Sequence, residues 1–196
     1  NQALENLPEI KKRLGVGDPA GAMAIIDGLP VEVRATRAIQ LMRVVSAQQI
    51  DEATYVAAMA EMDGHFAADP TLALMRIDAR ILAKDFRGAV DCIRQAGDLI
   101  GGDAFLDALA AQVAVLGGFT DEARTFLAQA RSAVVEDDKP TYMGILDAAI
   151  QVQDHGATAE TLAILKDRFD QDFDLDHEVF ATFAASAEGR ALRAAP

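Results

Sequence analysis

The sequence has one cysteine, no tryptophan and few basic residues, and each shortage excludes something. Cys92 cannot form an internal disulfide, and no histidine lies near it in the sequence, so we expect a buried, inert thiol. No apolar run approaches the ~18 residues that a membrane span requires. With 18 basic residues against 31 acidic ones, the net charge is −13, which disfavours binding to nucleic acid and to anionic membranes.

Patterns that carry catalysis or bind cofactors are also missing. The three histidines, His65, His155 and His177, have no His or Cys three or four residues away, as a zinc site would need. No arrangement of acid, base and nucleophile emerges from the sequence either. We therefore expect no enzymatic activity, no cofactor and no metal site.

An acidic run from residue 170 to residue 178 looks at first like a calcium-binding loop, with Asp at alternate positions. Leu175 stands where such a loop needs a glycine, and Ala181 stands where it needs a bidentate glutamate. The run is therefore interpreted as an exposed acidic linker, with weak cation binding as the alternative.

The composition favours helix, because 51% of residues are hydrophobic, aromatics make up 6%, and runs of β-branched residues are absent. Apolar residues recur at helical spacing between Gly and Pro breaks. Asp18, Asp69 and Ser186 are expected to cap helices. The expected helices span residues 2–14, 19–28, 31–48, 51–68, 70–82, 88–100, 104–116, 120–135, 141–153, 158–169, 177–185 and 187–192.

Residues 84–89 and 118–123 are two copies of one phrase, each opening a helix, and they indicate a repeat of helix pairs. Aligned on a small residue, the second helices of the pairs give steps of 31, 36, 34 and 38 residues. The aligned positions are Ala22, Ala53, Ala89, Ala123 and Thr161. An apolar residue follows four positions later, on the same helix face, where it can fill the groove between close helices.

This repeat resembles that of the tetratricopeptide-repeat family, whose 34-residue unit has a Gly-aromatic turn before an alanine-bearing second helix. The resemblance covers residues 1–170 and is best around Phe86 and Gly118. It implies an all-α fold, a right-handed superhelix of about five helix pairs, capped by helices in residues 171–196. It further implies that the first helices line a concave face, which binds a peptide or protein segment.

Two pairs of arginines stand out against the acidic background. Arg34 and Arg37 are expected on one face of the third helix, and Arg76 and Arg80 on one face of the fifth. Both are first helices of their pairs, so the arginines could hold carboxylates of a peptide partner. The alternative is that they pair with nearby Asp and Glu side chains on the outer surface.

The sequence therefore predicts a non-catalytic interaction module that binds a protein or peptide partner, and it leaves a homodimer open. The alternative is a bacterial chaperone or assembly factor for a secretion or cell-envelope component. We expect a cytoplasmic protein. Because Asn1 is not a methionine, a periplasmic protein that has lost a targeting segment is the alternative.

Overall fold

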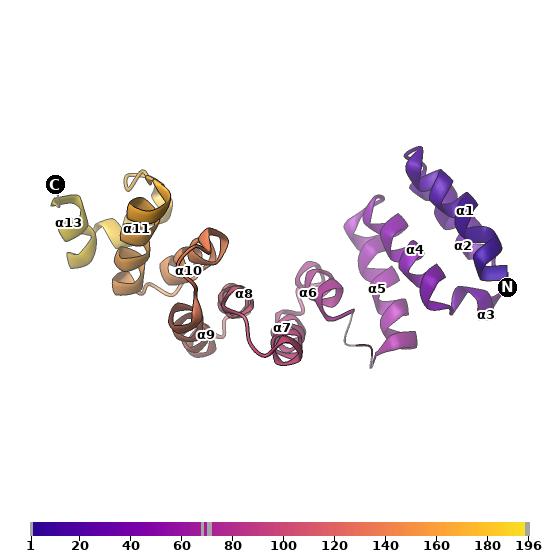
Figure 1. Cartoon of the computed structure of the whole chain (residues 1–196), viewed down its shortest axis with the longest axis horizontal. Coiled ribbons are helices and arrows are strands. Elements are labelled where there is room, and N and C mark those ends of the chain that lie inside the picture. The colour runs from indigo at the N-terminus through magenta and orange to yellow at the C-terminus, as the bar shows by residue number, and fades with distance from the viewer. Residues whose placement is uncertain (1, 68, 70–71, 195–196) are drawn as a thin grey trace. The chain divides into compact units, whose positions relative to one another are not determined.

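The computed structural model describes residues 2–67, 69 and 72–194, and in this part of the chain every regular element is helical (Figure 1). The predicted all-α class is thereby confirmed. The chain divides into two compact units, residues 1–83 and 84–196, so the C-terminal helices lie in the same unit as residues 84–170.

The helices of the first unit are α1 (Gln2–Gly15), α2 (Pro19–Asp27), α3 (Val31–Arg34), α4 (Arg37–Gln48), α5 (Glu52–Phe66) and α6 (Ala73–Leu82). Successive helices pack together, α1 on α2, α2 on α4, α4 on α5 and α5 on α6. One apolar cluster centres on Ile10, Ile26 and Ile39, and a second on Tyr55 and Met59. The predicted start of α6 at Pro70 lies outside the described residues.

The single helix predicted for residues 31–48 is wrong, because the chain breaks between α3 and α4. Thr36 has extended backbone angles, and its hydroxyl donates a 2.7 Å hydrogen bond to the carbonyl of Val33. The side-chain amide of buried Gln40 donates to the carbonyl of Arg34 at 3.1 Å. The Val33 carbonyl also accepts from the backbone N–H of Thr36, so carbonyls at the end of α3 have partners and the break is stable.

The second unit contains α7 (Phe86–Ile100), α8 (Ala104–Leu116), α9 (Thr120–Ala133), α10 (Lys139–Gln151), α11 (His155–Phe169), the 3-10 helix η2 (Glu178–Phe180), α12 (Ala181–Ala184) and α13 (Ala187–Ala194). Helix α8 packs against α7, α9 and α10, and α10 packs against α11. After an irregular stretch over residues 170–177, Phe180 and Phe183 are buried in one cluster with Leu162 and Leu165. The C-terminal helices thus cover the apolar end of α10 and α11.

The second helices α2, α5, α7, α9 and α11 share a regular pattern of burial that is counted from their N-caps. The fourth residue after each cap is buried, and these residues follow one another at steps of 33, 34, 34 and 35. They are Ala22, Tyr55, Ala89, Ala123 and Thr158, which are 0%, 6%, 0%, 0% and 0% exposed. The residue four positions further on is buried as well in every case.

This register corrects two of the five predicted alignments. Ala53 is exposed, and the buried side of α5 carries Tyr55 and Met59 instead. Thr161 is buried, but Thr158 occupies the position equivalent to Ala123. The cap sets which residues face inward, since it fixes where the helix begins, whereas a small side chain can stand on either face. The uneven predicted steps came from these two misplacements.

The turns that precede α2, α7, α9 and α11 share one backbone geometry. The residue before each cap has a positive φ, namely Gly17 at 75°, Lys84 at 58°, Gly118 at 77° and Gln153 at 58°. In three of these turns the N–H of the cap residue donates to the carbonyl five residues earlier, at 2.8–2.9 Å. This is the Schellman closure of a helix C-terminus, so the same helix–turn–helix join recurs at the repeat spacing.

Candidate functional site

Arg34 and Arg37 do not lie on one face of one helix, as predicted, because the break at Thr36 separates them. Arg34 is the last residue of α3, and its guanidinium donates a 3.4 Å hydrogen bond to the carbonyl of Asp27. Arg37 is the first residue of α4, and its Nε lies 3.0 Å from the carboxylate of Asp69. Both contacts are at the surface of the first unit.

Arg76 and Arg80 both lie on α6, and Arg76 is only 6% exposed. The Nε of Arg76 donates to Asp63 at 2.6 Å, and its two terminal nitrogens donate to the carbonyls of Phe66 and Asp69 at 2.6 and 2.8 Å. Arg80 lies 3.6 Å from the other carboxylate oxygen of Asp63. Arg76 therefore ties α6 to the C-terminal end of α5.

Three of the four arginines thus pair with local carboxylates, which was the alternative to a role in ligand binding. That alternative placed the arginines on the outer surface, but Arg76 is buried. Its guanidinium also donates to backbone carbonyls near the end of a helix. A role of these arginines in binding a partner stays a prediction. The buried fork gives Arg76 a structural task that competes with it.

A pocket of about 510 Å³ opens elsewhere, in the second unit. Residues of α7, α8, α9 and the α7–α8 turn line this site, which we name the α7–α9 groove. They are Ile93, Arg94, Gly97, Asp98, Gly102, Asp103, Leu106, Asp107, Ala110, Glu122, Thr125, Phe126 and Gln129. Helix α8 packs against both α7 and α9 and so forms the floor, where the buried side chains of Leu106 and Ala110 make an apolar surface together with Ile93 of α7.

Glu122 joins α9 to α7 where both helices begin. The guanidinium of Arg87 at the start of α7 makes two 2.8 Å hydrogen bonds to the Glu122 carboxylate. The same guanidinium carbon lies 3.8 Å from the centre of the Phe119 ring. The bidentate bond lowers the pKa of the Glu122 carboxyl, with smaller contributions from the charges of Arg87 and Arg94. The charge of the ionised Glu122 is therefore balanced by an arginine of the same chain.

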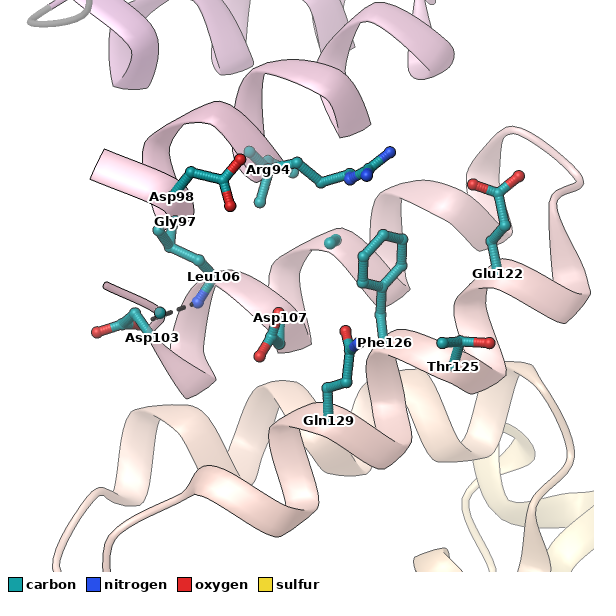
Figure 2. Close-up of a pocket in the computed structure, with 13 residues that line it drawn as sticks. Arg94, Gly97, Asp98, Asp103, Leu106, Asp107, Glu122, Thr125, Phe126 and Gln129 are labelled. Carbon is teal, nitrogen blue, oxygen red and sulfur yellow. Dashed lines mark hydrogen bonds between the residues drawn. The ribbon is translucent and has the colours of Figure 1, made fainter. Parts of the chain in front are cut away.

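The opposite end of the groove is acidic. Figure 2 shows Asp98, Asp103 and Asp107 on one side of the view, away from Phe126, Thr125 and Glu122. Asp103 caps α8 by accepting a 3.1 Å hydrogen bond from the N–H of Leu106. Burial raises the pKa of the Asp107 carboxyl, and the charge of Asp103 raises it further. In the part of the chain that the structure describes, Asp98 and Asp107 have no ion pair.

The sequence analysis did not predict this groove, because it considered only clusters of basic residues as candidate binding sites in the acidic chain. A usable signal was nonetheless present, since Asp98, Asp103 and Asp107 flank the Gly101-Gly102 break between two expected helices. Residues near a short turn between antiparallel helices are brought to the same end of the pair. The apolar neighbours Ile93 and Leu106 follow from the helical periodicity.

Other candidate sites have structural partners. In the acidic run, Asp176 pairs with Arg193 at 2.6 Å, and Gln171 accepts a 3.0 Å hydrogen bond from Lys139. Among the residues described here, no cluster of three or more His, Cys, Asp or Glu side chains could hold a metal ion. Cys92 is buried, as predicted. Within the same residues, no helix has the length and apolar character to cross a membrane.

The chain matches no protein-family model, and comparisons with curated proteins and with solved structures found no match. The resemblance to tetratricopeptide repeats therefore rests on the repeated caps, turns and buried positions of the chain itself.

Proposed function

We propose that this protein is a non-catalytic helical-repeat module that binds a peptide or protein segment of a partner. The observation that carries the proposal is the recurrence of one buried position at steps of 33–35 residues, together with one turn geometry. Units that repeat in this way bury their apolar faces against neighbouring repeats and leave an extended surface for a ligand. In this proposal the helix pairs stack into a right-handed superhelix, as in the family that the sequence resembles.

The chemistry of the side chains supports binding rather than catalysis. The carboxyls whose pKa values are raised, Asp107 and Asp147, owe this first to burial. The described histidines lie at separate places, His65 at the end of α5, His155 at the start of α11 and His177 before η2. A general acid or base must lie within hydrogen-bond reach of the proton that it transfers, and it is usually oriented by a second group. We therefore assign no catalytic role to these carboxyls or histidines.

The superhelix is tested by small-angle X-ray scattering. A compact chain of 196 residues has a radius of gyration of about 16 Å. An array of stacked pairs is expected to give a clearly larger value. A radius of gyration near the compact value would refute the stacked arrangement.

The binding function is tested by affinity capture with the immobilised chain, followed by calorimetry with overlapping peptides from each captured protein. We expect one peptide to reproduce the affinity of the whole partner, since a repeat surface reads a continuous segment. A partner that binds only before it folds, and is released on folding, would support the assembly factor instead. If no captured protein contains a segment that binds by itself, the module hypothesis is wrong.

A further inference from the structure

The α7–α9 groove combines two surfaces that single side chains of a peptide could occupy. Its floor is apolar, with Leu106 and Ile93 buried and the ring of Phe126 half-buried beside them. Its acidic end carries Asp98 and Asp107. A volume of about 510 Å³ lies within the 300–1,000 Å³ that is usual for ligand pockets. The groove is thus large enough for a few side chains of a peptide, and its acidic end favours those with a positive charge.

The acidic end of the groove differs from Glu122, which lines the other end, in having no arginine paired with it among the described residues. Glu122 is held by Arg87, and Glu160 forms an ion pair with Arg131. For Asp98 and Asp107, by contrast, the described residues provide no such cation. Arg94 lines the same groove, but Figure 2 shows its side chain extending toward Phe126 and not over Asp107.

The ionised form of the Asp107 carboxyl destabilises the protein when no ligand is bound. Partial burial removes water from it, and the neighbouring charge of Asp103 repels it, so both effects disfavour its ionised form. A cation placed in the groove would relieve both effects, because it supplies the missing opposite charge. The gain on binding is then larger than for a carboxylate that already has a partner.

We propose that the α7–α9 groove is the docking site for a cationic peptide segment in which a lysine or arginine stands next to an apolar side chain. The ammonium or guanidinium group lies between Asp98 and Asp107, and the apolar side chain packs on Phe126 and Leu106. This inference rests on the proposed function, since it names the kind of partner segment that the module binds. It moves the binding surface from the predicted arginines to an acidic site on another unit of the chain.

The first test uses a short fluorescent probe peptide with lysines on both sides of a leucine, and anisotropy at low ionic strength. We expect binding that weakens with added salt, and no binding of a version with glutamates in place of lysines. Asp98→Asn combined with Asp107→Asn is expected to weaken binding about tenfold, through the loss of two partly exposed ion pairs. Asp121→Asn is the matched control, because Asp121 lies on α9 but is fully exposed and does not line the groove.

The second test fills the groove without disturbing the fold. A Cβ atom added at Gly97 meets nothing within 4 Å, so Gly97→Ala should fold, and Gly97→Phe extends from the same open position into the groove that Gly97 lines. Gly97→Phe is expected to abolish probe binding because its ring occupies the groove, whereas Gly97→Ala binds as the wild type does. Circular dichroism checks that the two variants have equal helix content.

Two outcomes would overturn the inference. One is a probe Kd weaker than about 1 mM, or equal affinity for the double asparagine variant and the Asp121→Asn control. The other is a captured partner that binds Gly97→Phe and Gly97→Ala with the same affinity. That result would show that the partner does not bind in the groove, but it would still support the proposed binding module. If the chain captures no partner segment while the probe still binds in the groove, the proposed function fails and the groove's preference for cationic peptides remains.

Discussion

Replacing Arg76 with alanine should destabilise the first unit more than any substitution of a surface charge. The guanidinium of Arg76 makes three hydrogen bonds of 2.6–2.8 Å while its side chain is 7% exposed. Removing it leaves the carboxylate of Asp63 without its closest cation and the carbonyls of Phe66 and Asp69 without this donor. Breaking a buried ion pair costs about 3–5 kcal/mol, and we expect the lower end of this range because Arg80 still lies 3.6 Å from the Asp63 carboxylate.

The matched control is Arg80→Ala, which removes the same charge from the same helix. Arg80 is 43% exposed and lies 3.6 Å from Asp63, so its loss should cost at most about 1 kcal/mol. Arg76→Lys keeps the charge but loses the planar fork, and its stability should fall between the two alanine variants. The three variants together separate the contribution of charge from that of geometry.

The measurement is urea unfolding followed by circular dichroism, supported by thermal scans. For a unit of about 80 residues, 3 kcal/mol lowers Tm by roughly 12 °C or more. If Arg76→Ala and Arg80→Ala lost the same small amount of stability, the buried fork would contribute nothing net. Arg76 would then again be a candidate for binding a carboxylate of a partner.

Five further substitutions test packing and electrostatics. Ala89→Leu should cost about 1–3 kcal/mol by overpacking, whereas Ala53→Leu on the exposed side of α5 should change Tm little. Gly189→Ala should lower Tm because its Cβ would lie 2.2 Å from the carbonyl oxygen of Phe183, while Gly64→Ala, which meets nothing within 4 Å, should gain about 0.5–1 kcal/mol. Asp107→Asn should raise Tm at pH 7, since a raised folded-state pKa means that stability falls as pH rises from about 3.8 through that pKa. This gain should vanish in scans below about pH 3, and a gain that persists there would contradict the electrostatic cause.

Helix positions were predictable wherever the chain carries its own start and stop signals. Helix α8 has the predicted bounds, Ala104–Leu116, because Asp103 caps it and Gly117 ends it. Such signals act within one helical turn and need no knowledge of the rest of the fold. The break between α3 and α4 has no comparable signal. It depends on Gln40, whose side chain also reaches Glu61 on α5 at 3.0 Å, and this tertiary contact cannot be seen in the sequence.

The arginines show the limit of arguing from charge pattern alone. A pair spaced three or four residues apart predicts a shared helix face, but only if one helix contains both. That condition failed for Arg34 and Arg37, and burial changed the meaning of Arg76. In a chain with 31 acidic and 18 basic residues, carboxylates outnumber the cations that could pair with them, and Asp98 and Asp107 are among the described carboxylates without an ion pair. The candidate site is therefore better sought among unpaired carboxylates than among arginines.

The regular spacing of the repeat could have been predicted from the sequence by aligning the helix caps instead of the alanines. Asp18, Asp51, Asp85 and Asp154 each accept a hydrogen bond from the backbone N–H three residues later. A cap of this kind fixes the first residue of its helix, and the inward face follows from the helical period. The buried side chain at the fourth position varies from alanine to tyrosine, since neighbouring helices can adjust to its volume. The backbone geometry of the turn before α2, α7, α9 and α11 is kept instead, although its left-handed residue is Gly, Lys or Gln and the cap of α9 is Phe119. The repeat is thus conveyed by its turns, and side-chain size within the helices follows local packing.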